Sequence, residues 1–149
     1  MTDYRMQRAD DSVTHDERPA FAPLSIVDFE RAARAIDAQY RNFVALEVND
    51  HCVRVAVMEG EFRWHRHQRS DECFLVLEGE LEIDLADGTT VHLVPGQAFL
   101  IPRDIVHRTR AQRRTVNLCF EHRDAYTDVV FEDATGANGS SSRRGKSGG

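Results

Sequence analysis

Two histidines and a glutamate within the stretch 60–79 have the types and the spacing of metal ligands. His65 and His67 are two residues apart, Glu72 follows, and an alternating apolar run then ends at Gly79. On a β-strand the side-chain direction repeats every two residues, so both imidazoles would point to the same face. Two imidazoles and a carboxylate on one wall are most of a divalent-metal site. The plainer alternative is a polar loop that leads into a strand and binds nothing.

A third histidine lies in a strand-like segment further along the chain, over 105–110. In this segment His107 shares one face with Ile105 and Thr109, whereas the arginines that alternate with them lie on the other face. In a closed barrel the uncharged face points inward, so His107 would face the interior. There it can meet His65 and Glu72, although the pattern predicts only the phase of the side chain and not its distance.

The elements that must position these residues are short β-strands. From residue 41 onward, alternating apolar residues are divided by turn signals such as Asn49-Asp50, Asp87-Gly88 and Pro95-Gly96. We expect strands from 41 up to the first of these turns, then at 51–58, 72–78, 80–86, 90–94, 98–101, 105–110 and 115–121, with Arg113-Arg114 as a hairpin turn between the last two. Many short strands without intervening helices predict an all-β antiparallel barrel or sandwich.

One helix is expected before the strands, near residues 26–38. Its apolar residues recur at helical spacing, and Ser25 is the candidate N-cap with Asp28 as its acidic partner. We predict three parts of the chain: a disordered N-terminal segment at 1–22, a single domain at 23–131 and a flexible C-terminal tail at 132–149.

Composition narrows the classes of function. The chain has 149 residues and a net charge of −6, which fits one domain and argues against a nucleic-acid-binding protein. No apolar run is long enough to cross a membrane, and the polar first residues do not form a secretion signal. Cys52, Cys73 and Cys119 lack the spacing of a zinc ribbon and are expected to be reduced, so we expect a cytoplasmic protein.

Two motifs resemble those of the cupin superfamily. The first reads as Gly60, four residues, His65-Arg66-His67, four residues, Glu72, six residues and Gly79. The second reads as Gly96, five residues, Pro102-Arg103-Asp104, two residues and His107. Both occur in the right order, and the match extends through neighbouring strands to roughly 41–121. Within the superfamily the chain looks most like small single-domain bacterial cupins of the mannose-6-phosphate-isomerase-like type.

This resemblance implies a small double-stranded β-helix, or jelly-roll, barrel with one metal site. It implies that His65, His67, Glu72 and His107 bind one divalent ion, for which Fe, Mn, Ni, Zn and Co all suit a mixed nitrogen and oxygen set. Small cupins of this kind usually pair, so we expect a homodimer, with the segment 41–58 as the contact surface.

Two positions in the motifs need a decision. Asp71 competes with Glu72 for the carboxylate position, but the six residues to Gly79 select Glu72, and Glu72 is in phase with the following strand. Asp104 stands where the motif has glycine, which requires the aspartate to accept left-handed backbone geometry; aspartate does so better than most residues.

We predict a metal-dependent enzyme, of the dioxygenase or the isomerase and lyase type, that acts on a small polar molecule at an open metal site. In such a site Glu72 could also move a proton. The alternative is a non-catalytic cupin that binds or senses a sugar or a small organic acid. A purely structural dimerisation barrel is a third and weaker reading, because packing alone has no need for a cluster of histidines.

Overall fold

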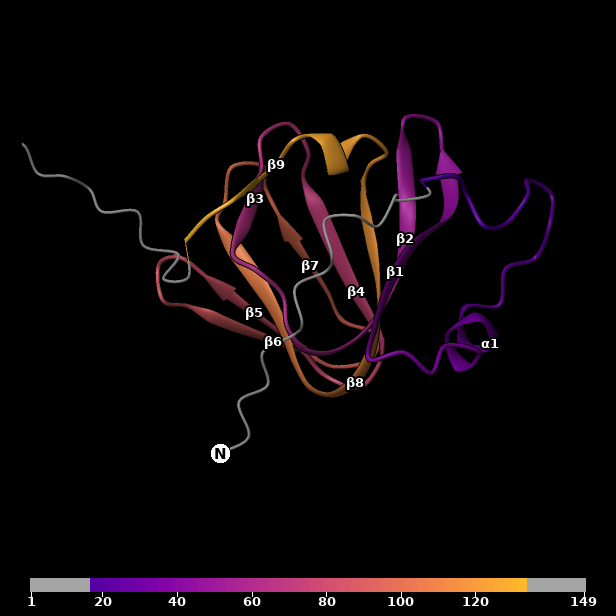
Figure 1. Cartoon of the computed structure of the whole chain (residues 1–149), viewed down its shortest axis with the longest axis horizontal. Coiled ribbons are helices and arrows are strands. Elements are labelled where there is room, and N and C mark those ends of the chain that lie inside the picture. Colours follow the sequence, from indigo (N-terminus) through magenta and orange to yellow (C-terminus); the bar gives the residue numbers. More distant parts are fainter. Residues whose placement is uncertain (1–16, 134–149) are drawn as a thin grey trace, which may run out of the picture.

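The computed structural model describes residues 17–133, which form one antiparallel, nearly all-β fold with a single short α-helix (Figure 1). The predicted disorder of 1–16 and the predicted flexibility of 134–149 lie outside these residues. The elements in chain order are α1 (Phe29–Arg34), β1 (Tyr40–Val48), β2 (His51–Glu61), β3 (His65–His67), β4 (Glu72–Glu78), β5 (Leu81–Leu85), β6 (Thr90–Leu93), β7 (Ala98–Ile101), β8 (His107–His122), a 3₁₀ turn η1 (Ala125–Thr127) and β9 (Val129–Phe131).

Strand β8 is the centre of the fold, because it pairs with β2, β3, β4 and β5. The sequence predicted two strands here with a turn at Arg113-Arg114, and this was wrong: β8 runs unbroken through both arginines. The pairing of β8 with its neighbours is instead irregular opposite this region. The register shifts between Met58 and Gly60 on β2 and between Val76 and Glu78 on β4. One continuous strand therefore carries His107 at its start and the partners of Glu72 near its end.

The barrel interior is filled by apolar side chains from most of the strands, namely Met58, Phe74, Val76, Leu81, Ile83, Leu93, Ile101, Ala111 and Cys119. A second apolar cluster covers the opposite, outer face of β1, β2, β4 and β8. It contains Val53, Val55 and Val57 together with Phe29 and Ala33 from α1. Because the valines of β2 face outward under the helix, the residue that alternates with them, Arg54, faces the interior.

Helix α1 is shorter than predicted and is capped differently. It spans six residues, and the Asp28 side chain accepts a hydrogen bond from the Arg31 backbone N–H. Ser25 is not the cap, since its hydroxyl donates to the carbonyl of Ala22. At the other end the guanidinium of Arg114 donates to the carbonyls of Ala33 and Ile36, which anchors the helix to β8.

The segment before the helix lies along β1. The backbone N–H of Ala20 donates to Val44 O at 2.9 Å, and that of Phe21 donates to Ala45 O at 3.2 Å. Two residues of the segment that the sequence placed before the domain, 20 and 21, are therefore hydrogen-bonded to the edge strand β1. Among the described residues no helix is long and apolar enough to cross a membrane.

The outer face of β5 is charged, in contrast to the outer face of β2. Asp84 accepts hydrogen bonds from Arg108 Nε at 2.8 Å, Arg110 Nε at 2.7 Å and Thr90 Oγ1 at 2.7 Å. These bonds join β5 to β6 and to the start of β8, next to His107. Burial of the Asp84 carboxyl opposes its ionisation, but the hydrogen bonds from Arg110, Thr90 and Arg108 outweigh burial and lower its pKa below 3.8.

We expect Asp84→Asn to lower the free energy of unfolding by about 2 kcal/mol at pH 7, a figure reduced for the partial exposure of both arginines. Because the native pKa is depressed, this contribution is present above about pH 3.8 and is lost as the pH falls through the native value. Urea unfolding of both proteins at pH 7 and at pH 3 measures the difference. An equal difference at both pH values would contradict the ion-pair origin.

Candidate metal centre

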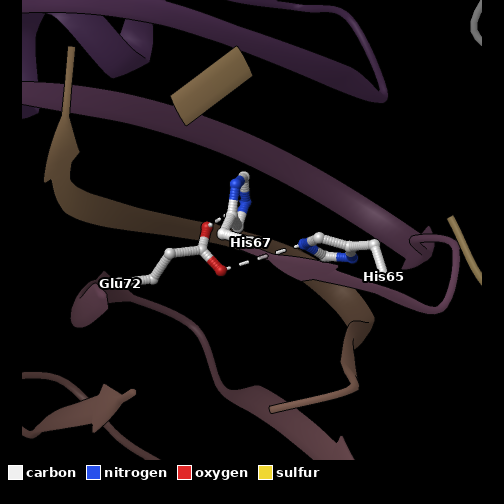
Figure 2. A group of neighbouring side chains, drawn as sticks. All are labelled: His65, His67 and Glu72. Atoms are coloured by element: carbon white, nitrogen blue, oxygen red, sulfur yellow. Dashed lines mark ion pairs between the residues drawn. The ribbon is translucent and has the colours of Figure 1, made fainter. Parts of the chain in front are cut away.

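Four side chains predicted as ligands converge at one end of the barrel interior. His65 and His67 lie on β3, Glu72 begins β4, and His107 begins β8 directly opposite His65 in the strand register. The Glu72 carboxylate lies between the imidazoles: Oε2 is 2.9 Å from His107 Nε2 and 3.8 Å from His65 Nε2, and Oε1 is 3.2 Å from His67 Nε2. Figure 2 shows the carboxylate pointing toward the two histidines of β3.

Each histidine is oriented by a hydrogen bond at its other ring nitrogen. His65 Nδ1 lies 2.8 Å from the carbonyl of Arg63, and His107 Nδ1 lies 2.9 Å from the carbonyl of Ile105. His67 Nδ1 lies 2.7 Å from Asp128 Oδ1. All three partners are acceptors, so Nδ1 carries the proton and Nε2 is the nitrogen presented to Glu72. Metal-binding histidines are held in this way.

Two buried atoms at the centre have no satisfactory hydrogen-bond partner among residues 17–133. These are Glu72 Oε2 and His107 Nε2, which lie 2.9 Å apart. Glu72 is 5% exposed and His107 is 1% exposed, so solvent does not compensate them fully. Buried lone pairs that face each other are costly unless a proton or a metal ion lies between them. The donor set therefore fits a divalent ion.

Burial and charge act differently on the two histidines of β3. Burial and the neighbouring His107 lower the pKa of His65 to about 4. Burial also acts to lower the pKa of His67, but the carboxylates of Glu72 and Asp128 outweigh it and raise the pKa to about 9. The pKa of Glu72 stays well below its usual range, because its contacts with His107 and His67 outweigh burial. Without a metal, the His67–Glu72 pair thus holds a proton near neutral pH.

Two turn positions of the motifs have left-handed backbone geometry. Gly79 has a φ of 82°, and a Cβ there would lie 2.6 Å from the carbonyl oxygen of Arg114, so only glycine fits. Asp104 has a φ of 66°, the left-handed geometry predicted for it, and its carboxylate binds Arg66. Asp71 lies outside the site, where it accepts a hydrogen bond from the backbone of Arg103.

The family model that matches this chain is described as a cupin domain and covers residues 52–118. An uncharacterised protein of Bacillus subtilis, YdbB, is 52% identical over 100 residues, which are 67% of this chain and 88% of that protein. The chain belongs to the cupin family. With the motifs and the barrel this confirms the predicted family and fold.

Solved structures agree with this cupin fold. A cupin-2 domain protein from Shewanella frigidimarina is 29% identical and superposes with a TM-score of 0.62, covering 65% of this chain and 94% of that one. Protein NMB1881 from Neisseria meningitidis is 20% identical with a TM-score of 0.61, covering 66% of this chain and 99% of that one. At this identity the second similarity shows the fold alone.

Sequence reasoning missed several side chains of this cupin that surround the predicted ligands. Asp128 follows η1, beyond the residues that the family model matches, and is 5% exposed. Glu121 lies opposite Glu72 in the strand register, with its Oε2 4.0 Å from His67 Nε2. Glu121 could have been predicted from the alternation of side chains along β8, because it lies two residues after the interior residue Cys119 and shares its face. No sequence pattern indicated Asp128, because it lies between η1 and β9, outside any strand, where the chain places it beside His67.

Glu121 and Cys119 make a second group around the same carboxylate. The ligand atoms of Glu72, Cys119 and Glu121 lie within 4.8 Å of one another. Burial and the charge of Glu72 raise the pKa of Glu121 to about 7. Burial raises the pKa of the Cys119 thiol, so at neutral pH this cysteine contributes a thiol rather than a thiolate.

The remaining described histidines, His51, His92 and His122, lie outside the cluster. Their side chains are 61%, 54% and 37% exposed. Such exposed imidazoles supply matched controls for variants of the ligands.

We expect Asp128→Asn to weaken metal binding by about 10- to 100-fold while the barrel stays folded, because it removes the carboxylate that orients His67 and increases its basicity. The Asp128 carboxylate also accepts the Arg69 backbone N–H at 2.9 Å, a bond that the asparagine oxygen can keep. Competition with a chelator measures the affinity. Asp124→Asn, in the same segment but exposed, is the control. Equal affinities of all three proteins would contradict this role.

Proposed function

We propose that this cupin holds one divalent metal ion on His65, His67, Glu72 and His107 and is a metal-dependent enzyme for a small polar molecule. The observation that carries the proposal is the orientation of the three imidazoles. Each Nδ1 is engaged by an oxygen acceptor, so each Nε2 is directed at a buried carboxylate that has an unpartnered oxygen. A packing cluster has no need for this arrangement.

A bound divalent ion would supply Lewis acidity toward a substrate oxygen or, if it were iron, oxygen chemistry. The chain itself supplies two buried carboxyls beside each other. Glu72 can accept a proton from His67, to which it is already close, and Glu121 has a pKa of about 7, near the value suited to proton transfer at neutral pH. This pair favours an enzyme over the alternative of a cupin that only binds or senses its ligand.

Metal analysis of the protein purified without added metal, and again after incubation with Fe, Mn, Ni, Zn or Co, tests the site. We expect about one equivalent per chain in the wild type and in His92→Ala, and a loss of bound metal in His65→Ala and in His107→Ala. A wild type that takes up no metal under any of these conditions would reject the site. Retention by both ligand variants would also reject it.

We also propose a homodimer. On the outer sheet face, Leu100 and Phe120 flank Cys73 in the strand register and are 56% and 39% exposed, which leaves apolar surface beside the part that α1 covers. In the segment 41–58, the predicted contact region, Val48 is 58% exposed. Light scattering should give twice the chain mass of 17.0 kDa. A mass equal to one chain would reject the dimer.

A further inference from the structure

Inside the barrel, beside the candidate metal centre, lies an arginine that the proposed function does not use. Arg54 is 8% exposed and projects from β2 to the interior. Its Nε donates to Glu121 Oε1 at 2.5 Å, and Glu121 Oε2 lies 4.0 Å from His67 Nε2. A single carboxylate therefore separates the guanidinium from a proposed metal ligand.

The other side of this guanidinium is occupied by a carboxylate from the N-terminal segment. Arg54 Nη2 donates to Glu17 Oε2, and the side chain of Glu17 is 18% exposed. Residues 20 and 21 bond to the edge of β1, so Glu17 reaches Arg54 past the edge strand of the sheet. Glu17 comes from a chain segment outside the barrel strands, whereas Glu121 is part of the barrel wall.

Polar and aromatic groups connect this carboxylate position to the metal centre. Asn42 Oδ1 lies 3.4 Å from Arg54 Nη1, and Asn42 also hydrogen-bonds the buried Tyr40 hydroxyl. The Tyr40 ring stacks on Phe62 with centroids 6.0 Å apart, and Phe62 meets His65 edge-on at 5.2 Å. The aromatic rings of Tyr40 and Phe62 thus connect the polar residues around Arg54 to the proposed metal ligand His65.

The charges around Arg54 explain why a carboxylate would bind there. One guanidinium faces two carboxylates, of Glu121 and Glu17, and its other ionisable neighbours include the thiols of Cys52 and Cys119 and the Tyr40 hydroxyl. Without Glu17, the Nη2 side of a buried guanidinium would lose its carboxylate partner, and the planar Nη edge matches a carboxylate in shape and charge. The ligand that would replace Glu17 on Arg54 is therefore itself a carboxylate.

We infer that Arg54 is the binding site for a substrate carboxylate, and that Glu17 occupies this site as an internal competitor in the ligand-free protein. The inference rests on the proposed function and narrows its substrate class to small organic acids, with the carboxylate on Arg54 and another polar group toward the metal centre. Sugars without a carboxylate are then poor ligands.

Succinate, a four-carbon dicarboxylate, and its neutral analogue succinamide are the probes, with affinity measured by calorimetry on the metal-loaded and on the metal-free full chain. We expect Glu17→Ala to bind succinate about tenfold or more tightly than the wild type, because the fraction of chains with an open Arg54 rises. Arg54→Lys should bind succinate at least about tenfold more weakly, because a lysine lacks the planar pair of donors. Succinamide should bind to none of these proteins.

Glu30→Ala, which removes an exposed carboxylate on α1, is the control for the change in net charge. Equal succinate affinities in the wild type, Glu17→Ala and Glu30→Ala would overturn the inference, and so would succinamide binding as tightly as succinate. This result does not depend on whether Arg54→Lys folds. Metal content is measured on the same samples: if the chain takes up no metal in the loading step and still shows the Glu17 effect, the proposed metal site is wrong and the carboxylate site is supported.

Discussion

Replacing Glu72 by glutamine should weaken the binding of a divalent metal by roughly 100-fold or more and leave the metal-free barrel folded. Glutamine keeps the shape of the side chain but loses the charge that lies between His65, His67 and His107. In the wild type, metal at 100 times its dissociation constant should raise the free energy of unfolding by about 2.7 kcal/mol. In Glu72→Gln the same metal concentration should raise it by about 0.4 kcal/mol or less.

The neighbouring Asp71→Asn is the matched control, because it removes the same charge one residue away. The Asp71 carboxylate binds the backbone of Arg103 and takes no part in the cluster. Thermal unfolding with and without metal compares the three proteins. If Asp71→Asn loses the metal-dependent increase and Glu72→Gln keeps it, the choice of Glu72 as the carboxylate ligand is wrong.

Metal affinity should also rise steeply with pH. The pKa of His67 is raised to about 9 in the metal-free protein, so at pH 7 the metal must displace the proton that this histidine holds with Glu72. We expect the apparent association constant to rise by about tenfold per pH unit between pH 6.5 and 8.5, with about one proton released per metal. Chelator competition at a series of pH values measures the slope, and an affinity that is flat over this range would contradict the assignment.

The stability of the metal-free protein should change with pH in the opposite direction. A native pKa above the ordinary value of 6.5 contributes stability that is complete below pH 6.5 and is lost as the pH rises through about 9. The raised pKa of Glu121, about 7, acts in the same sense, and the lowered pKa values of His65 and Glu72 act below this window. Urea unfolding of chelator-treated protein at pH 6.5 and pH 9 tests the sign, and a gain in stability toward pH 9 would contradict it.

Local pattern predicted the strands well where side chains alternate between two environments. The predicted limits of β4 and β7 agree with the structure, and the turns at Asp50 and Gly88 lie where expected. The prediction was wrong at Arg113-Arg114, because two adjacent charged residues also occur in a long strand when one is exposed to solvent and the other finds a partner. Arg114 finds one in the end of α1, which is distant in sequence.

The rule that the uncharged face of a strand points inward was right for β8 and would be wrong for β2. His107 and Thr109 are buried in the interior, and the arginines that alternate with them pair with Asp84 on the outer face. In β2 the valines face outward, because α1 covers them, and Arg54 faces inward. A strand pattern shows which residues share a face, but only the packing of other elements decides which face is inside.

By itself, the sequence determined the type and phase of the four proposed ligands, since residue identity and a period of two suffice for both. Their convergence, with His65 opposite His107 and Glu72 between the imidazoles, was decided by the tertiary structure, since it depends on how β3, β4 and β8 pair. The same holds for Asp128 behind His67 and for Arg54 with Glu17. These contacts join residues up to 61 positions apart, and no local pattern encodes a contact made by chain closure over such a distance.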